Sequence, residues 1–513
     1  MDSVKLVESL AAFLALVFLY HIWPKRKGET KRRPTEPGGA WPVVGHLRLL
    51  TGTTPLHRTL AALSEKHGPL FTLRLGQMRA LVVGSMDLAK ECFTTNDQAF
   101  ASRPPLESSK CLGYGCAMLG LAPYGPYWRE VRKITTIELL SNRRLDLLKH
   151  IRVEEVGSLV EALYRSCAGD YSVDINRLFS NLSMNIVLRM VAGKRYFNLD
   201  GEENDGDEEE FRKVISEFFH LLGVLTVSDA IPCLEWLDVG GHLKDMKRVK
   251  KKMDGFASAW LAEHRRERKS GRRDTERDFI DVLIKEVEDD HLSKKHQTDT
   301  IIEATAMSLV AAGTDTTSVT LEWALSAMLN NRQVLEKAKE ELDCKVGRER
   351  QVEESDIKNL AYLQAILKET MRLYPAVPLL VPHQSIEPIH LGGYHIPTGT
   401  TLFVNTWKIH RDPMLWTDPE EFRPERFLTS DKEIGFGGQN FAFMPFGMGR
   451  RMCPGWTMAL QVLHLTLARL LQSFEWSMPM DEPVDMTEGF GLTMPKAAPL
   501  KVRLTPRLPP HLY

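Results

Sequence analysis

The sequence predicts a mainly α-helical protein with small β-sheets, built as one large domain behind an N-terminal transmembrane helix. Residues 299–330 and 457–471 have the apolar spacing of buried helices. Residues 70–83 alternate between apolar and polar around Gly76, which is typical of a β-hairpin. Residues 4–23 are long and apolar enough to cross a bilayer. We therefore expect long helices to form most of the body and sheets to be minor.

The N-terminal segment, residues 1–24, is predicted to be a membrane anchor. About twenty residues at ~1.5 Å each reach ~30 Å, the thickness of the hydrocarbon layer. The clean apolar centre, residues 10–20, also has the length of a signal-peptide core. A run of basic residues follows instead of a small-residue cleavage site, which favours an uncleaved anchor. The same basic residues place the body on the cytosolic side.

Residues 25–45 form a predicted basic, proline-rich hinge, and residues 46–513 form the globular domain. The chain has 513 residues and a formal net charge of −1, so its overall charge carries no footprint of a nucleic-acid-binding protein. The seven cysteines are scattered and odd in number, and none forms a C-x-x-C pair. This pattern argues against a disulfide framework or a zinc site and fits a reducing compartment.

A glycine-punctuated loop near the C-terminus, residues 445–455, carries Cys453 directly before a predicted helix. A thiolate needs backbone N–H donors and a helix N-terminus to remain ionised, and this position offers both. Gly449 and Gly455 are expected to adopt positive φ and to let the backbone approach the sulfur. The loop therefore predicts a reactive or ligating thiolate, whereas a lone cysteine is more often simply buried.

The predicted helix 299–330 contains the polar run Gly313-Thr314-Asp315-Thr316. A glycine inside a helix costs about 1 kcal/mol, so we expect a compensating reason such as the close approach of a flat ligand. The adjacent carboxylate and hydroxyl could relay protons and hold a water molecule. The alternative is a kinked buried helix whose threonines bond back to carbonyls.

Two further pairs lie at helical spacing. Glu369 and Arg372 stand three residues apart before an apolar run, and a buried pair there needs a third partner, which Arg426 would supply. Trp128 and Arg132 stand four apart at the start of another predicted helix, where a cation–π pair is the ordinary interpretation.

Taken together, these motifs resemble the cytochrome P450 monooxygenases of plant microsomes, and the overall sequence is most like their family 82. The cysteine loop matches F-x-x-G-x-R-x-C-x-G through Phe446, Gly449, Arg451 and Cys453, and the helix matches A/G-G-x-D/E-T. The resemblance implies the cytochrome P450 fold, in which residues 46–513 are a single catalytic domain wrapped around haem b. It also implies a single-pass protein of the endoplasmic reticulum membrane with a cytosolic catalytic domain.

The resemblance also assigns roles to individual residues. Cys453 is the expected axial ligand of the haem iron. Asp315 and Thr316 are expected to deliver protons. Structural roles fall to Glu369, Arg372 and Arg426, which should hold the fold of the cysteine loop. The expected cofactor-binding residues, which contact the haem propionates or pack near the sulfur, are Trp128, Arg132, His383, Phe446, Arg451 and Cys453.

The implied reaction inserts one oxygen atom from O2 into an apolar plant metabolite, by hydroxylation, demethylation or epoxidation of an alkaloid, terpenoid, steroid or flavonoid. Electrons are expected to come from NADPH through NADPH–cytochrome P450 reductase, because the chain has no convincing nicotinamide-binding fingerprint of its own. The segments expected to contact substrate are apolar and match the topology of the family. They are residues 112–121, 218–224, 309–316, 376–380 and 490–493.

Two other functions remain open at this point. A haem-thiolate isomerase or dehydratase would need neither O2 nor a reductase, and it would have no use for the Asp315–Thr316 pair. A non-enzymatic haem protein would bind a small ligand or gas without substrate-dependent consumption of NADPH.

Overall fold

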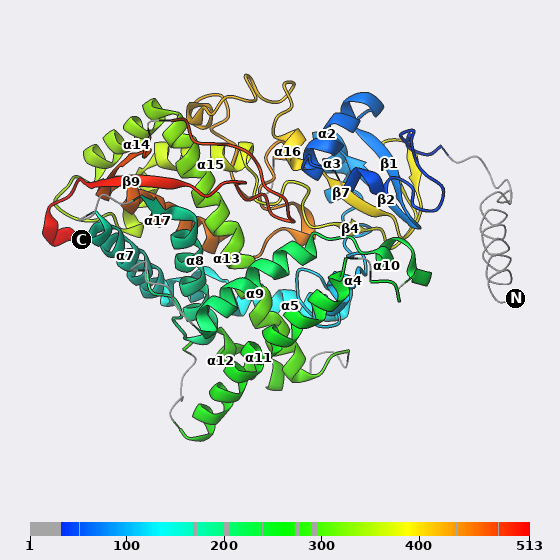
Figure 1. Ribbon diagram of the computed structural model, residues 1–513, viewed down its shortest axis with the longest axis horizontal. Coiled ribbons are helices and arrows are strands. Elements are labelled where there is room, and N and C mark those ends of the chain that lie inside the picture. Colours follow the sequence, from blue (N-terminus) through cyan, green and yellow to red (C-terminus); the bar gives the residue numbers. More distant parts are fainter. Residues whose placement is uncertain are drawn as a thin grey trace, which may run out of the picture.

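The computed structural model describes residues 32–513 except 51, 168–171, 200–205, 235, 239, 272–276, 290–294, 438–439 and 481. The predicted anchor and the first part of the hinge lie outside these residues. In the part of the chain that is described, no helix combines the length and apolar character needed to span a membrane. Helices make up most of the body, and a four-stranded sheet lies at one end of it (Figure 1). The predicted fold class is thus confirmed.

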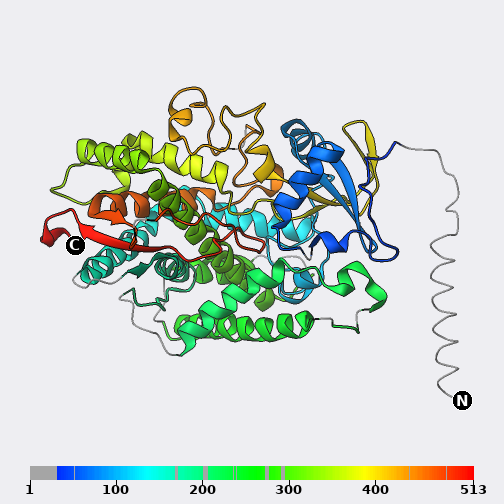
Figure 2. The ribbon, with the colours of Figure 1, turned by 45° about the horizontal axis from the view of Figure 1, so that its top comes forward.

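Long helices build the larger part of the molecule (Figure 2). The described α-helices are α2 (Leu56–His67), α3 (Met86–Phe93), α4 (Glu107–Cys111), α5 (Pro126–Ile134), α6 (Asn142–Leu147), α7 (Lys149–Ser166), α8 (Ile175–Ala192), α9 (Asp207–Leu222), α10 (Val227–Ala230), α11 (His242–Lys269), α12 (Phe279–Asp289), α13 (Thr298–Asn330), α14 (Arg332–Lys345), α15 (Ala361–Leu373), α16 (Thr406–Ile409) and α17 (Trp456–Ser473). Short 3-10 or π turns extend or connect them at Leu47–Leu50, Thr135–Leu139, Pro232–Leu234, Glu354–Asn359, Pro424–Leu428, Gly449–Arg451 and Pro510–Leu512.

Three small sheets complete the fold, in the orders β1-β2-β7-β4, β3-β9-β8 and β5-β6. The predicted hairpin is confirmed, since Leu70 pairs with Val83 and Leu75 with Met78 in antiparallel register. The strands are β1 (Leu70–Leu75), β2 (Met78–Val83), β3 (Val173–Asp174), β4 (His383–Gln384), β5 (Ile389–Leu391), β6 (Tyr394–Ile396), β7 (Thr401–Val404), β8 (Phe474–Ser477) and β9 (Lys501–Pro506).

Helix α13 runs through the middle of the core, as its nearly uniform apolar character predicts. It has 33 residues and packs against α8, α11, α12, α15 and α17. A Cβ atom added at Gly313 would lie 2.9 Å from a methyl carbon of Val187 on α8. The close packing of two helices is thus one reason for this glycine, and the approach of a flat ligand stays a prediction.

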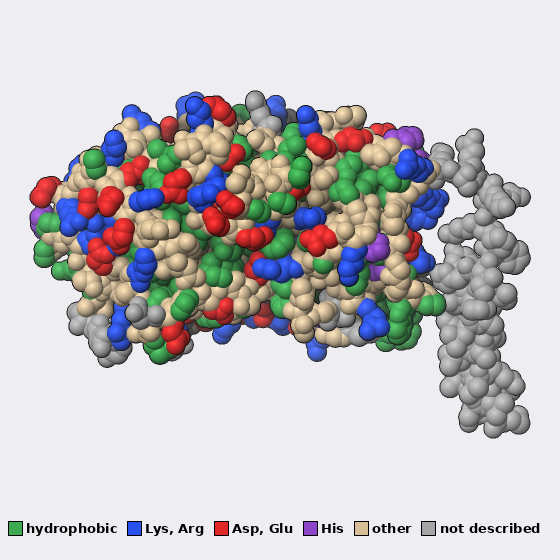
Figure 3. Space-filling view, turned by 90° about the horizontal axis from the view of Figure 1, so that it is seen from above, with side chains coloured by type: hydrophobic (Ala, Val, Ile, Leu, Met, Phe, Trp, Pro, Cys, Tyr) green, Lys and Arg blue, Asp and Glu red, His purple; other side chains and the backbone are tan. Residues whose placement is uncertain are grey.

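The outer surface mixes charges of both signs over the face seen in Figure 3. Such a surface has no large single-sign field for a polyanion to follow. This distribution agrees with the near-zero net charge of the whole chain.

The predicted Glu-Arg-Arg network is present and buried. Arg372 donates to both carboxylate oxygens of Glu369 at 2.7 and 2.9 Å, and Nε of Arg426 donates to the same carboxylate at 3.0 Å. The backbone N–H of Arg423 adds a further hydrogen bond of 2.9 Å. Glu369 and Arg372 are fully buried and Arg426 is 2% exposed, so the ionised groups depend on one another for compensation.

The network connects to the cysteine loop through His410. Arg372 donates to the carbonyl oxygen of His410 at 2.7 Å, and Nε2 of His410 accepts a hydrogen bond of 2.8 Å from the backbone N–H of Met444. Burial, with the nearby charges of Arg372 and Arg411, lowers the pKa of His410 to about 3, so the ring is neutral and can accept this bond. Met444 directly precedes the loop that carries Cys453.

Replacing Arg426 with alanine should destabilise the fold by about 3–5 kcal/mol, because it leaves the buried carboxylate of Glu369 under-compensated. The exposed neighbour Arg423 pairs with Asp418 at the surface, and its replacement with alanine should cost less than about 1 kcal/mol. Urea unfolding of the full chain measures both. Equal losses for the two variants would contradict the role assigned to the network.

Candidate active site

Cys453 is half-buried and lies just before α17. Its backbone N–H donates to the carbonyl oxygen of Phe446 at 2.9 Å, which closes the loop. Burial raises the pKa of the Cys453 thiol, while the backbone N–H of Gly455 and the charge of Arg132 act in the opposite direction. The sulfur therefore has the donors expected for a thiolate but needs a stronger positive partner, such as a metal ion, to lose its proton in this buried position.

The two glycines of the loop behave differently. Gly449 has a φ of 67°, and a Cβ atom there would lie 2.3 Å from the Asp97 carboxylate, so only glycine fits. Gly455 has a φ of −93°, and a Cβ atom would meet the Cys453 sulfur only at an ordinary 4.0 Å. The expectation of a positive φ at Gly455 is thus wrong, because this residue already turns into α17.

Three arginines converge beside the cysteine loop without a carboxylate partner. Arg132 donates to the carbonyl of Met452 at 2.6 Å. Arg103 donates to three carbonyls at 2.7–3.0 Å, and Arg451 donates to three at 2.6–3.3 Å. Each of their hydrogen bonds within the described residues goes to the backbone, and none of them forms an ion pair with a described acidic side chain.

The buried charges perturb one another. Burial, together with the charges of Arg103 and Arg132, lowers the pKa of Arg451 to about 8. Burial alone lowers the pKa of Arg103 to about 9, and burial also lowers the pKa of Arg132 although Cys453 opposes it. Buried cations without counter-charges are costly, so this cluster is built to receive an anion.

Trp128 contributes a neutral donor to the same place. Its side chain is buried, and Nε1 has no hydrogen-bond partner in the described structure. The guanidinium of Arg451 stacks over its ring at 4.2 Å, so the cation–π partner is this arginine from the cysteine loop and not the expected neighbour Arg132. The helix that carries Trp128 thereby contacts the loop that carries Cys453.

These features fit the haem that the sequence resemblance implies. A half-buried thiol suits an axial ligand, and the three guanidinium groups and the orphaned indole N–H suit two propionates. Phe446 packs against Phe436 with ring centroids 5.8 Å apart, and this contact supports the cysteine loop. Its contact with the sulfur itself stays a prediction.

His383 is less straightforward as a propionate partner. Its Nδ1 donates to the carbonyl oxygen of Phe100 at 2.8 Å, and burial together with the charges of Arg103 and Arg451 lowers its pKa well below the usual value. A neutral ring in this tautomer presents Nε2 as an acceptor. The expected propionate contact therefore requires a protonated ring, which a nearby carboxylate would favour.

Asp315 and Thr316 lie side by side on α13 as the motif predicts. Asp315 is half-buried, and its carboxylate oxygen Oδ2 is buried and has no partner among the described residues. Burial raises its pKa, and a hydrogen bond from Thr493 partly opposes this shift. The hydroxyl of Thr316 donates to the carbonyl of Ala312 at 2.8 Å, so the back-bonding alternative describes its geometry correctly. The hydroxyl oxygen of Thr316 can still accept a hydrogen bond from another group.

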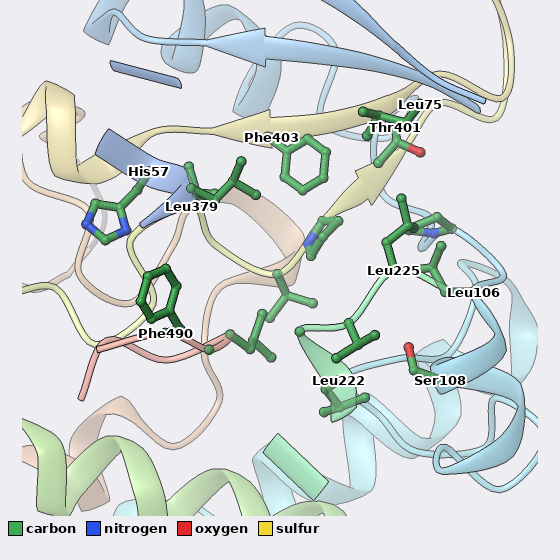
Figure 4. Close-up of a pocket in the computed structure, with 18 of the residues that line it drawn as sticks. His57, Leu75, Leu106, Ser108, Leu222, Leu225, Leu379, Thr401, Phe403 and Phe490 are labelled. Carbon is green, nitrogen blue, oxygen red and sulfur yellow. The ribbon is translucent and has the colours of Figure 1, made fainter. Parts of the chain in front are cut away.

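A cavity of about 580 Å³ opens beside this region. Its wall is mostly aliphatic, with Phe403 and Thr401 from β7 on one side and Phe490 from the C-terminal loop on the other (Figure 4). Arg103 and Thr493 also line it, so the cavity reaches both the arginine cluster and the neighbourhood of Asp315. None of the described residues that line it carries a carboxylate, so a cationic ligand would find no counter-charge in its wall.

The predicted substrate segments agree with this cavity in part. All of residues 490–493 line the cavity, as do Leu121 and parts of 218–224 and 376–380. Residues 309–316 and Cys453 do not line it. The cavity extends instead toward α2 and β1, where Leu60, Leu73 and Leu75 form a wall that was not predicted.

Sequence reasoning also missed two individual residues. Arg103 is a single cation in a run of small and apolar residues, and that isolation is the signal that could have identified it. Leu380 lines the cavity with a φ of 55°, a conformation that costs a branched side chain about 1–2 kcal/mol. No pattern in the sequence predicts the strained backbone of Leu380.

The comparisons with known proteins agree with this geometry. The family model described as cytochrome P450 matches residues 34–502. Flavonoid-6-hydroxylase of Mentha piperita is 49% identical over 520 residues, and xanthotoxin 5-hydroxylase CYP82C4 of Arabidopsis thaliana, whose name carries the family number 82, is 48% identical over 525; each alignment covers 100% of both chains. A zebra fish cytochrome P450 structure with progesterone is 29% identical and has a TM-score of 0.75, covering 89% of this chain and 100% of the other.

Replacing Trp128 with phenylalanine should weaken haem retention about tenfold or more, because it removes one buried donor to a charged acceptor and keeps the ring. Trp416 is also buried with an unpartnered indole N–H, but it stacks on Arg372 of the Glu369 network. Its replacement with phenylalanine should leave haem retention unchanged. Transfer of haem to an excess of apomyoglobin measures both rates, and equal rates would contradict the role of Trp128.

Proposed function

Because the chain belongs to the cytochrome P450 family and is a haem-dependent monooxygenase, we propose that it oxidises an apolar, uncharged specialised metabolite of plants, with Cys453 as the iron ligand. The observation that carries the ligand assignment is the cluster of three arginines, Arg103 buried and Arg132 and Arg451 half-buried. It lies beside the only cysteine, among the described residues, in a loop at a helix N-terminus. The relatives named for hydroxylation of a flavonoid and of xanthotoxin support the substrate class.

The residues of this chain have distinct tasks in the proposed reaction. Arg103, Arg132, Arg451 and Trp128 hold the two propionates, and Cys453 ligates the iron. When bound, the haem supplies the activation of O2 and the transfer of one oxygen atom to the substrate. The aliphatic cavity wall orients the substrate and excludes water from it.

Asp315 is proposed to deliver protons from α13 toward the distal side. Its unpartnered Oδ2 and its raised pKa mean that the carboxyl group keeps a proton to a higher pH than an exposed aspartate does. The hydroxyl of Thr316, next along the helix, is proposed to position the receiving water molecule. An isomerase or a passive haem protein would have no need of this pair.

The electron donor is proposed to be NADPH–cytochrome P450 reductase, and the site of action the endoplasmic reticulum membrane. Residues 1–24 are proposed as the anchor that holds a cytosolic catalytic domain. Two exposed tryptophans support a membrane-facing end: Trp41 is 54% exposed and Trp236 is 78% exposed. Hydrogen bonds from the β1–β2 turn reach Val44 and Ala230, so the segments that carry these tryptophans lie near each other.

Replacing Cys453 with serine should abolish the thiolate-type absorption band of the reduced carbon monoxide complex, because an alcohol at this position does not ionise as a thiol does. The exposed Cys344 provides a matched control, and its replacement with serine should preserve the band. Difference spectra of microsomes containing equal amounts of each chain make the comparison. A band that persists in the Cys453 variant would disprove the ligand assignment.

Replacing Asp315 with asparagine should lower the rate of product formation about a hundredfold, as expected for the loss of a positioned proton donor. In the wild type the rate should fall as the pH rises through the pKa of Asp315, because only the protonated carboxyl group can donate. That fall should disappear in the variant. Rates measured against pH in the presence of the reductase test this.

The half-buried Glu303 lies twelve residues earlier on α13, about 18 Å along the helix axis. It also has a raised pKa, caused by burial and by Asp254. Its replacement with glutamine should leave both the rate and its pH profile unchanged. A similar loss of rate in the Asp315 and Glu303 variants would show that replacing Asp315 lowers the rate by destabilising the protein and not by removing a proton donor.

A further inference from the structure

The carboxylate of Glu488 joins three segments that lie far apart in the sequence. Its side chain is 2% exposed. It accepts hydrogen bonds from Nε and Nη2 of Arg58 at 2.6 and 2.9 Å, from Nε2 of His57 at 2.8 Å, and from Nε1 of Trp407 at 3.1 Å. His57 and Arg58 belong to α2 and Trp407 to α16. One buried carboxylate therefore fastens the C-terminal segment to two helices.

The negative charge of Glu488 is compensated by its neighbours within the protein. Burial would raise the pKa of Glu488, but hydrogen bonds and charge from His57 and Arg58 outweigh it and lower the pKa to about 2. The guanidinium of Arg58 also lies 4.8 Å above the ring of Trp407, which Arg411 contacts from 4.1 Å. Since the carboxylate is ionised at neutral pH, it can only accept, and all of its neighbours donate.

The residues directly after Glu488 form a wall of the cavity. Residues 489–493 all line it, and Phe490 points upward from this loop toward Leu379, close to His57 (Figure 4). Phe490 is 59% exposed, so its position depends on the loop backbone more than on its own packing. At the far end of the loop, Thr493 lies close enough to Asp315 to act on the pKa of its carboxyl group.

The loop is held at both ends; between them Leu492 and Thr493 also pack against the body, whereas Phe490 is exposed. Gly489 N–H donates to the carbonyl of Pro495 at 2.7 Å, and Glu488 pairs with Lys496 in an antiparallel bridge. The N–H of Met494 donates to the carbonyl of Ala376 at 2.9 Å, and its own carbonyl accepts from Trp323 at 2.8 Å. Only the Glu488 side chain connects this hairpin to α2 and α16 through a buried charge.

We propose that Glu488 is a positioning residue that fixes the 489–493 loop, and with it Phe490, as one wall of the substrate cavity. It thereby sets the affinity for bulky apolar ligands without touching them. This inference rests on the proposed function only in taking the cavity as the place where substrate binds.

If Glu488 only stabilised the fold, its replacement would lower stability without changing the relative affinities for bulky and small ligands. The control is therefore another buried carboxylate. Glu155 is 1% exposed and accepts hydrogen bonds from Asn185, Arg189 and Arg195 at 2.7–3.1 Å. It joins α7 to α8 and does not line the cavity. Replacing it with glutamine therefore reproduces the chemical change away from the ligand.

The experiment compares the full-length holoenzyme with its Glu488→Gln and Glu155→Gln variants by spectral titration with two iron-coordinating probes, imidazole and the bulky apolar clotrimazole. Glu488→Gln should weaken clotrimazole binding about tenfold and change imidazole binding by less than about twofold. Glu155→Gln should leave both affinities unchanged. Equal weakening of both probes by Glu488→Gln, or no weakening of clotrimazole, would overturn the proposal.

A double-mutant cycle with Phe490→Ala tests whether Glu488 acts through the loop. In the Phe490→Ala background, Glu488→Gln should change clotrimazole affinity by less than about twofold, because the wall residue that it positions is gone. A full tenfold effect in that background would mean that Glu488 acts by another route. If Glu488→Gln fails to hold haem, Trp407→Phe removes a single donor and should show the same selectivity at about threefold.

Hydrogen exchange gives a readout that needs no iron ligand. Exchange in residues 484–497 should accelerate in Glu488→Gln and stay unchanged in Glu155→Gln, which should instead accelerate exchange in α7 and α8. Unchanged exchange in residues 484–497 would contradict the proposal even if affinities shift. A wild type that gives no spectral change with imidazole would instead refute the proposed haem site, and the two failures are therefore distinguishable.

Discussion

The buried carboxylate of Glu369 is the constraint on which the rest of the structure depends. Its negative charge is tolerated only because Arg372 and Arg426 surround it, and those guanidinium groups in turn bind the backbone carbonyls of residues 410, 417–419 and 421. The neutral ring of His410 then accepts a hydrogen bond from the backbone N–H of Met444, directly before the cysteine loop. The place of Cys453 is thus set by an ionic network that has no chemical role in oxidation.

A second group of arginines shows the opposite electrostatic design. Among the described residues, Arg103, Arg132 and Arg451 donate hydrogen bonds only to backbone carbonyls, and burial lowers their pKa values. The network around Glu369 is neutralised within the chain, whereas this cluster depends on anions from a ligand. Arg103 and Arg132 thus lie close to Arg451 in the cysteine loop, although more than three hundred residues separate them from it in the sequence.

Local spacing explains which parts could be predicted. The β1–β2 hairpin, helix α13, the Glu369–Arg372 pair and the Cys453 loop each lie within one contiguous stretch, so their chemistry shows in the sequence. Contacts between distant segments do not show. The neighbour of Gly313 is Val187, and the partner of Trp128 is Arg451, because helix packing and loop closure decide both. The α2 and β1 side of the cavity and the strained Leu380 also arise only when the sheet meets the helices.

The uncompensated arginine cluster also connects this protein to the metabolism of its cell. In the proposed site, the binding energy between propionates and these three guanidinium groups would be realised only in the folded state, so cofactor supply would add directly to the stability of the chain. A newly synthesised polypeptide that has not received haem retains that electrostatic cost and spends more time in open, protease-sensitive forms. If these arginines hold the propionates as proposed, enzyme abundance should follow haem availability after translation.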